Sequence, residues 1–480
     1  MIEQQHAPVT LEEMAVQELA THLRGTLLRP GDVGYEEARA VYNGMINKHP
    51  ALIARCVDVA DVIAAVNFAR EQQLTLAVRG GGHNGPGLGT CDDGLVIDLS
   101  GMKGIRVDPV ARTVRVEGGC TWGDVDHATH PFGLATPSGL ISTTGVGGLT
   151  LGGGIGYLAR SLGLTIDNLL GVDLVLADGS FVTASADEHA DLFWAVRGGG
   201  GNFGVVTSFL FQLHPISTVY GGPMLWPFAQ AADILKFWRN FILNAPEEIN
   251  GSFGLVTVSP APPIPEQFHL KKMCTIVWCY SGALEQAEEV FQPIRTNIPP
   301  VVDFARPMSW PVLQSLFDAL YPPGLQWYWK TDFFTGLSAK AIDLHLKYGA
   351  QLPTRHSTMY LHPMNGAVHR IGASETAFSF RDANFAEVIV GVDPDPANNQ
   401  RMIGWARDYW MALHPYSAGG GYVNMMMDEG TDTVKVAYRD NYARLAQIKA
   451  MYDPGNLFHV NQNIIPTNGG NGYGKSHRTH

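Results

Sequence analysis

Glycine-rich stretches are the feature of this sequence that most clearly suggests chemistry. Glycine makes up 54 of the 480 residues, well above its usual share of about 7%. It gathers in three clusters, which span residues 80–89, 139–156 and 198–204. Backbone that turns this tightly can point several amide N–H groups at one anion. The clusters therefore predict a site for an anionic cofactor.

Two of the clusters contain the spacing G-x-G-x-x-G, which is typical of a turn that binds a dinucleotide. In that turn a strand precedes the glycines and a helix follows, because the helix N-terminus holds the pyrophosphate. Gly80, Gly82 and Gly85 follow an expected strand, but the residues after them, "GPGLGTCDDGLVIDLS", lead to another strand. The second match, in "GGGGNFGVVTSFLF", also leads into a strand. The sequence therefore favours backbone nests over a Rossmann turn.

The elements expected around these turns are mostly short strands. In the first 215 residues we expect a helix over 58–73, with Asp61 as a possible N-cap, and a hairpin over 172–185 around Asp178-Gly179. Further strands are expected over 74–79, 94–100, 113–119 and 205–215. This mixture lacks the regular β-α-β alternation of a doubly wound sheet and predicts an α+β fold.

Glycine becomes rarer after residue 215, where helices alternate with strands. A helix is expected over 230–243, strands over 274–282 and 326–334, and a last helix that begins at 440 and ends at Asp453-Pro454. We therefore expect three parts of the chain: a first domain over 1–215, a second domain over 216–425, and a C-terminal segment over 426–480.

Composition and charge argue against several function classes. Hydrophobic residues make up 45% of the chain and charged residues 16%, which predicts a large core and little disorder. The net charge of −12 disfavours nucleic acid and anionic membranes as partners. The five cysteines form no C-x-x-C pair, so we expect neither a disulfide framework nor a metal site. The sequence shows no signal-peptide pattern and no long apolar run, so we expect a cytoplasmic protein. We also expect it to be a monomer or a homodimer.

Four motifs in order along the chain carry a family resemblance. They are "RGGGHN", "TPSGLISTTGVGGLTLGGGIG", "DLFWAVRGGGGNFGVVTSF" and "YDPGNLFHVNQNIIP". Together they resemble the motifs of the berberine-bridge-enzyme-like FAD-linked oxidases, within the vanillyl-alcohol-oxidase/PCMH flavoprotein superfamily. The resemblance extends from about residue 31 to Pro466. It implies a two-part PCMH-type FAD-binding domain, a substrate domain with an antiparallel sheet covered by helices, and a C-terminal segment that returns to the FAD domain.

The resemblance implies that FAD is bound covalently, through His83 to the flavin 8α-methyl group. Imidazole is a good nucleophile near neutral pH, and a glycine turn can hold it at the ring edge. Many family members add a second link from the cysteine of a "C-P-T-V-G-x-G-G" turn. The aligned stretch here is "ISTTGVGG", in which Ile141 takes the place of the cysteine. We therefore expect a bacterial-type single link and no cysteine link.

The other cofactor contacts that the resemblance implies lie in the glycine clusters and near the C-terminus. They are Arg79, Gly80, Gly81, Gly82, Asn84, Ser142, Thr143, Thr144, Gly147, Gly148, Gly152, Gly156, Val206, Asn461 and Asn463. Val206 is expected at the adenine end. Thr144 stands where family geometry faces the flavin carbon that meets O₂, and its small size favours an oxidase that makes H₂O₂ over a dehydrogenase.

Tyr422 is the expected catalytic base. Hydride transfer to flavin N5 needs a group that takes the proton of the adjacent O–H or N–H, and "GGGYVNMMMDEG" resembles the family strand that carries such a tyrosine. Asn424 would share its face of the strand. A free tyrosine titrates near pH 10, so a nearby positive charge or the flavin must lower its pKa. Lys330, which shares one face of "QWYWK" with Tyr328, is the candidate; each of these residues could instead be ordinary sheet packing.

On the substrate side, "LHPMNGAVHRIGASETAFSFRD" resembles a family strand pair, with His369 and Arg370 as pocket residues or as an exposed edge. The Trp, Tyr, Phe and Met of the second domain favour an aromatic or apolar small molecule over a carbohydrate. The expected function is an FAD-dependent oxidase that takes a hydride from a small alcohol or amine and passes electrons to O₂. A flavin dehydrogenase with another acceptor, and a flavin-fold binding module without turnover, remain open alternatives.

Overall fold

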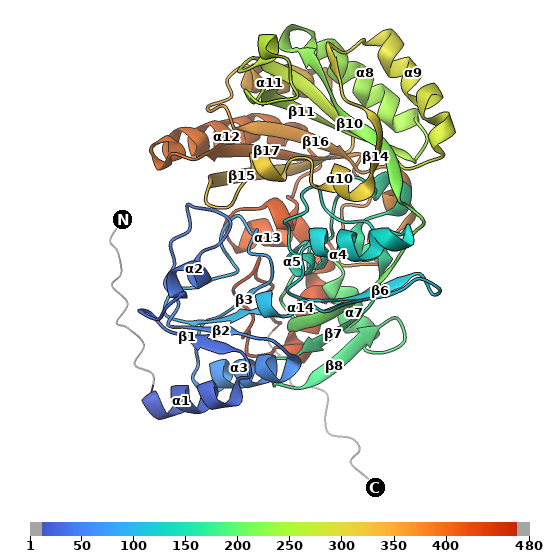
Figure 1. Ribbon diagram of the computed structural model, residues 1–480. Coiled ribbons are helices and arrows are strands. Elements are labelled where there is room, and N and C mark those ends of the chain that lie inside the picture. The colour runs from blue at the N-terminus through green and yellow to red at the C-terminus, as the bar shows by residue number, and fades with distance from the viewer. Residues whose placement is uncertain (1–11, 468–480) are drawn as a thin grey trace.

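Three β-sheets organise the computed structural model, which describes residues 12–467 (Figure 1). Two sheets lie in the lower half of the view in Figure 1 and the third lies in the upper half. Residues 1–11 and 468–480 fall outside the described part of the chain, so the expectations that concern them stay untested. Among the described residues, no helix has both the length and the apolar character that crossing a bilayer requires.

The first sheet has the strand order β1-β2-β4-β3, in which β2 and β3 each run parallel to β4. Its strands are Thr26–Leu28 (β1), Leu52–Arg55 (β2), Leu76–Arg79 (β3) and Leu95–Asp98 (β4). The helices around it are Glu13–His22 (α1), Tyr35–Arg39 (α2) and Val59–Glu71 (α3). The expected N-cap of α3 is wrong: Asp58 caps this helix by accepting the N–H of Asp61. The Asp61 carboxylate is needed elsewhere, since it accepts from the amides of Arg24 and Gly25.

The second sheet is antiparallel, with the order β5-β6-β9-β7-β8. Its strands are Ile105–Asp108 (β5), Thr113–Glu117 (β6), Leu169–Val175 (β7), Phe181–Ser185 (β8) and Val205–Gln212 (β9). The expected hairpin at Asp178-Gly179 is confirmed by the pairing of β7 with β8. Helices in this part of the chain are Trp122–Thr129 (α4), Val146–Leu151 (α5), Ala159–Leu162 (α6) and Ala190–Val196 (α7).

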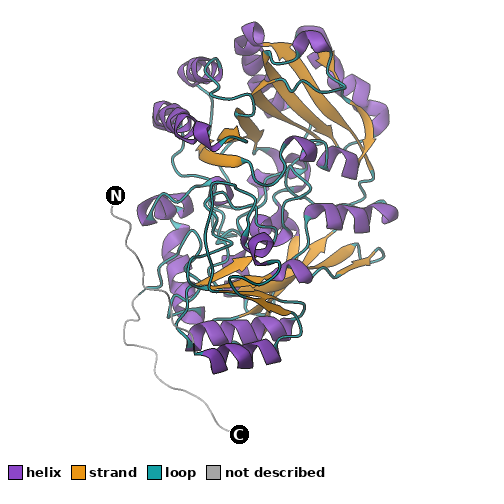
Figure 2. Cartoon of the chain, turned by 60° about the vertical axis from the view of Figure 1, so that its left-hand side comes forward, coloured by secondary structure: helices purple, strands orange, loops and turns teal. Residues whose placement is uncertain are grey.

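The third sheet has eight antiparallel strands, in the order β13-β10-β12-β11-β16-β17-β15, with β14 beside β10. Its strands are Thr218–Pro227 (β10), Ile249–Thr257 (β11), Lys272–Tyr280 (β12), Val302–Asp303 (β13), Arg306–Ser309 (β14), Gln326–Phe334 (β15), Thr358–Pro363 (β16) and Phe385–Asp393 (β17). The accompanying helices are Ala231–Asn244 (α8), Ala287–Asn297 (α9), Trp310–Gln314 (α10), Ala339–Gly349 (α11) and Asn399–Leu413 (α12). Helices cover one face of this sheet, and the other face looks toward the lower half (Figure 2).

The chain returns to the lower half after this sheet. Its last helices are Thr431–Tyr438 (α13) and Asn441–Tyr452 (α14), and α14 ends at Asp453-Pro454 as predicted. Side chains of both helices share one hydrophobic core with the second sheet. Mixed sheets with segregated helices make this an α+β fold, as predicted.

A buried carboxylate joins the two halves. Asp126 on α4 accepts a hydrogen bond from the indole N–H of Trp310 on α10, at 2.7 Å, and both side chains are buried. Burial raises the pKa of Asp126 from 3.8 to about 7, against the opposing effect of the Trp310 N–H. The pKa of Asp126 is higher in the folded protein than in the unfolded chain, so the unfolded chain loses this proton at lower pH. The contribution of Asp126 to the free energy of unfolding therefore falls by roughly 4 kcal/mol as the pH rises from about 4 to 7.

Asp126→Asn should therefore stabilise the protein at neutral pH. The amide oxygen still accepts from Trp310 but carries no charge to desolvate. We expect the Tm of the variant to exceed that of the parent at about pH 8, and the advantage to shrink toward about pH 5. Thermal unfolding at both pH values measures this, with the exposed Asp187→Asn as a control. A Tm advantage that does not depend on pH would contradict the assignment.

Candidate active site

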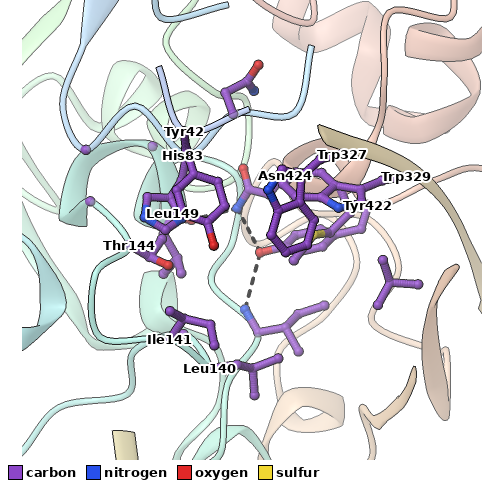
Figure 3. Close-up of a pocket in the computed structure, with 18 of the residues that line it drawn as sticks. Tyr42, His83, Leu140, Ile141, Thr144, Leu149, Trp327, Trp329, Tyr422 and Asn424 are labelled. Atoms are coloured by element: carbon purple, nitrogen blue, oxygen red, sulfur yellow. Dashed lines mark hydrogen bonds between the residues drawn. The ribbon is translucent and has the colours of Figure 1, made fainter. Parts of the chain in front are cut away.

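A cavity of about 320 Å³ lies between the lower sheets and the third sheet (Figure 3). Residues 79–84, from the end of β3, and residues 139–141, 144, 145, 148 and 149, around the start of α5, line one side of it; strands β15, β16 and β17 line the other. A narrower cavity of about 140 Å³ shares lining residues with it, among them Gly80, Asn84, Gly148 and Asn461. The two form an elongated site for a ligand that is larger than one ring system.

Glycine is required where the two turns beneath this site meet. A Cβ atom on Gly81 would lie 2.4 Å from the backbone nitrogen of Gly145, and a Cβ on Gly145 would lie 2.4 Å from that of Gly81. Only glycine permits such backbone-to-backbone contact. By contrast, a Cβ on Gly148 would meet no atom within 4 Å, so this face of α5 is open to the cavity. The turns thus form a cradle for a flat ligand.

His83 lies in the first turn and lines the larger cavity. Its ring stacks on Tyr42, with centroids 3.9 Å apart and planes 16° from parallel. Burial lowers the pKa of His83 to about 4, while a hydrogen bond with the Thr143 backbone opposes this effect. The imidazole is therefore neutral at pH 7, and a ring nitrogen can act as a nucleophile. Ile141 and Thr144 line the same cavity from the second turn (Figure 3).

Most residues predicted to bind a cofactor come together around the two cavities. Those that line one or both are Arg79, Gly80, Gly81, Gly82, His83, Asn84, Thr144, Gly147, Gly148, Val206 and Asn461. The guanidinium of Arg79 already has partners within the protein. It pairs with Asp98 at 2.6 Å and donates a hydrogen bond to the Ala38 carbonyl. It stiffens the first turn and offers no free charge to a ligand.

Five predicted cofactor contacts do not line either cavity: Ser142, Thr143, Gly152, Gly156 and Asn463. Ser142 instead donates its hydroxyl and its amide to the Asp318 carboxylate, which ties the second turn to the segment before β15. Gly152 and Gly156 are needed for packing: a Cβ on Gly156 would lie 1.8 Å from the Ser138 oxygen. Ser142, Gly152 and Gly156 therefore take part in contacts within the protein that shape the wall of the site.

Tyr422 reaches the cavity from a turn and not from a strand. The expected strand is absent, since residues 423–425 form a short 3₁₀ helix. The Tyr422 hydroxyl oxygen accepts hydrogen bonds from the amides of Gly154 (2.9 Å) and Ile155 (3.3 Å). It also accepts one from the side-chain amide of Asn424, at 2.8 Å (Figure 3). Burial raises the pKa of Tyr422 above 10, and the three donors oppose that rise. The donors make the phenolate less costly than burial alone would.

The expected partnership of Lys330 and Tyr328 with Tyr422 is corrected by the structure. Alternation along β15 does separate two faces, but Trp327 and Trp329 line the cavity. Lys330 points toward α12, with Nζ 4.3 Å from the centroid of the Trp410 ring, and pairs at 2.8 Å with Glu429 in the loop before α13. Tyr328 accepts a hydrogen bond from the Arg407 guanidinium. The hydrogen-bond donors to Tyr422 take the place of the expected positive charge.

His369 and Arg370 also lie away from the cavity. They belong to a 3₁₀ turn over Gly366–Arg370, not to a strand pair. His369 hydrogen-bonds the Ala383 carbonyl, and Arg370 forms an exposed ion pair with Glu247. The expected pocket position is therefore wrong, while the expected exposure of both residues is confirmed, on a 3₁₀ turn and not at a sheet edge.

Sequence reasoning missed a polar pair on the upper wall. Ser252 on β11 and His362 on β16 both line the cavity, with Oγ and Nδ1 2.9 Å apart. Burial lowers the pKa of His362 to about 4. The alternation of Thr358, Tyr360 and His362 along "TMYLHP" could have indicated one shared face. Within residues 12–467, no cluster of His, Cys, Asp and Glu could hold a metal ion.

A buried lysine fixes the C-terminal segment beside the narrower cavity and was also missed. Lys449 donates to Asp453 (2.6 Å) and to the carbonyls of Asn202 and Phe458. Asp453 in turn accepts the amide of Phe458. This network joins the loop after α7 to the segment that carries Asn461, so it positions the wall of the cavity without touching a ligand.

Comparison with known proteins agrees with this geometry. A family model described as "FAD binding domain" matches residues 50–185, and one described as "Berberine and berberine like" matches residues 421–465. An FAD-linked oxidoreductase of Dictyostelium discoideum is 34% identical, over 94% of this chain and 97% of that protein. (R)-6-hydroxynicotine oxidase of Paenarthrobacter nicotinovorans is 29% identical, over 93% and 98%.

Solved structures resemble the whole fold. The crystal structure of 6-hydroxy-D-nicotine oxidase from Arthrobacter nicotinovorans has a TM-score of 0.82 at 27% identity, covering 92% of this chain and 98% of that one. BBE-like 1 from Physcomitrella patens has a TM-score of 0.84 at 24% identity, covering 95% and 100%, and shares the fold. The cradle of glycine turns, with an adjoining slot, fits FAD. The chain belongs to the berberine-bridge-enzyme-like family of FAD-linked oxidoreductases.

Proposed function

We propose that the protein is an oxidase whose FAD is held covalently through His83 alone and whose substrate is a small alcohol or amine. The observation that carries this proposal is one cavity lined both by a neutral imidazole in a glycine turn and by the hydrogen-bonded hydroxyl of Tyr422. Bound FAD would accept a hydride from the substrate carbon and pass two electrons to O₂, giving H₂O₂.

The chain's own residues would hold the cofactor in two ways. His83 supplies the nucleophilic nitrogen, and the stacked ring of Tyr42 limits its orientation. Ile141 lines the cavity where a cysteine would provide a second link, and its side chain cannot form one. The narrower cavity, with Val206 and Asn461 in its walls, would take the nucleotide portion. In domain terms, residues 12–215 and 426–467 would bind FAD and residues 216–425 would bind the substrate.

Tyr422 would act as the base. As the substrate carbon loses its hydride, its O–H or N–H proton must leave so that the C=O or C=N bond can form. Tyr422 in its phenolate form takes that proton, and the donors from Gly154, Ile155 and Asn424 stabilise the phenolate beforehand. Burial strengthens each of these hydrogen bonds to the phenolate, because water does not compete for the oxygen.

Reaction with O₂ tests the oxidase assignment. We expect the flavin of the photoreduced protein to reoxidise within seconds of admitting air, with one H₂O₂ formed per flavin. Thr144→Leu should slow this step by about tenfold, a barrier increase of about 1.4 kcal/mol, because a larger side chain obstructs O₂ at the cavity wall. Stopped-flow absorbance and a peroxide assay measure both quantities, and the exposed Thr218→Leu is the control.

Two other results would redirect the assignment. Slow reoxidation of the parent protein in air would favour a dehydrogenase that uses another acceptor. A flavin that no member of a broad panel of alcohols and amines reduces would favour a binding module without turnover.

A further inference from the structure

The third sheet presents an ordered surface to the cavity. The register of β16, β17 and β15 places His362, Ala386 and Phe333 in one row across the sheet, with Ser252 beside His362 on β11. Two rows further along, the same register places Trp329 next to Val390. Adjacent strands are about 4.8 Å apart and alternate side chains share a face. Of these residues, Ser252, His362, Trp329 and Val390 line the cavity, so its wall is polar at Ser252 and His362 and aromatic at Trp329.

The polar corner is built and not incidental. Ser252 and His362 are 5% and 8% exposed, so both are more than nine-tenths buried. Their hydrogen bond occupies Nδ1 of His362. Among the described residues no protein group hydrogen-bonds Nε2, while the ring lines the cavity. Nε2 is therefore open to the cavity and available to hydrogen-bond a ligand there.

Tyr422 lies at this same end of the cavity. The amide of Ile155 donates to the Tyr422 hydroxyl, and Ile155, Tyr422 and Ala386 pack in one cluster. Ala386 is the cross-strand partner of His362. The proposed base and the unpartnered nitrogen therefore face one region, which sets the polar end of a substrate there and its apolar body toward Trp329.

The charges around the cavity decide which polar group fits. Among the described lining residues there is no Asp or Glu, and the one arginine, Arg79, is paired with Asp98. A protonated amine would lose its hydration here without a carboxylate partner. Cation–π attraction to aromatic faces such as Trp327 would offset only a small part of that loss. A carboxylate would likewise find no free cation.

We propose that the substrate is an uncharged alcohol with a ring-sized apolar body, and that Ser252 and His362 bind its hydroxyl end. The proposal rests on the proposed oxidase function and narrows its substrates from alcohols and amines to alcohols. His362 acts as a specificity-determining residue, hydrogen-bonding through Nε2, and Ser252 fixes its orientation.

Matched probes on the flavin-loaded protein at about pH 7 test the charge argument. We would titrate cinnamyl alcohol, cinnamylamine and cinnamate and follow the flavin difference spectrum. The alcohol should bind about 100-fold more tightly than either charged analogue. Equal or tighter binding of the amine would overturn the proposal, and so would the absence of a spectral change with all three.

Variants of the polar pair test its role. His362→Ala should weaken cinnamyl alcohol binding and raise its KM by about tenfold, the loss of one hydrogen bond, with a much smaller change in kcat. His362→Gln keeps a neutral donor and acceptor and should recover part of the affinity. Ser252→Ala removes only the hydroxyl that orients His362, so it should raise the KM for cinnamyl alcohol by less than His362→Ala does. His127→Ala, on the exposed side of α4, is the control.

The outcomes separate this proposal from the oxidase assignment. Photoreduction and reoxidation in air are measured on the same samples and need no substrate. If reoxidation is fast but His362→Ala leaves KM unchanged, or Gln recovers nothing, only the substrate proposal fails. If the parent lacks flavin or reoxidises slowly, the oxidase assignment fails by itself.

Discussion

His83→Ala is expected to release all of its flavin on acid denaturation, whereas the parent keeps its flavin with the precipitated protein. The neutral imidazole in the first glycine turn is the nucleophile proposed for the single covalent link, and alanine cannot replace it. Absorbance of the supernatant and of the redissolved pellet measures the partition directly. Because the cradle of backbone turns stays intact, the native variant should still bind FAD reversibly.

The control for this experiment is His459→Ala. His459 is an exposed histidine in the C-terminal segment, two residues before the cavity residue Asn461, and its ring hydrogen-bonds the Asn456 carbonyl. The flavin of the His459→Ala variant should remain in the pellet. Flavin that stays with the His83→Ala pellet would mean that another residue is bonded to it. That result would contradict the inference that Ile141, in place of a cysteine, leaves His83 as the single covalent link. Release from the parent would contradict covalent attachment altogether.

Local patterns in the sequence predicted the parts of the fold that depend on local interactions. The glycine spacing after β3 was interpreted correctly because the following residues form β4, which pairs with β3 in parallel. The Asp178-Gly179 turn predicted the hairpin of β7 and β8 because its geometry depends on residues next to each other; Gly179 has φ of +84°. Each of these features is decided within a few residues of the motif.

Features that depend on contacts between distant segments could not be predicted from the sequence. Alternation along β15 separated Trp329 from Lys330 but could not tell which face meets the cavity, because packing of the helix layer decides that. The Ser142–Asp318 contact joins residues 176 positions apart, and the Ser252–His362 pair joins residues 110 apart. A single sequence carries no signal for such pairs, so the polar corner of the cavity became visible only in the folded chain.

Tyr422→Phe is expected to lower the rate of flavin reduction by about 10²–10⁴-fold, the range typical of losing a general base. Only the phenolate can accept the substrate proton, and burial holds the pKa of Tyr422 above 10. In the parent the rate should therefore rise about tenfold per pH unit up to that pKa, because the phenolate fraction rises tenfold per unit. The phenylalanine variant should lose this dependence. Anaerobic stopped-flow reduction by cinnamyl alcohol, between about pH 6 and 10, measures both profiles.

Two companion variants show whether the hydroxyl acts through the proposed network. Asn424→Ala removes a donor that lowers the pKa of Tyr422, so its rate should fall by one constant factor across the measured pH range while keeping the tenfold rise per pH unit. Tyr328→Phe removes the same hydroxyl from the opposite face of the sheet, where it contacts Arg407, and should leave the profile unchanged. A parent profile that is flat with pH, or a phenylalanine variant as fast as the parent, would contradict the base assignment. In that case Tyr422 would serve only to hold residues 154–155 and Asn424 in place, and the proton would have to leave by another route.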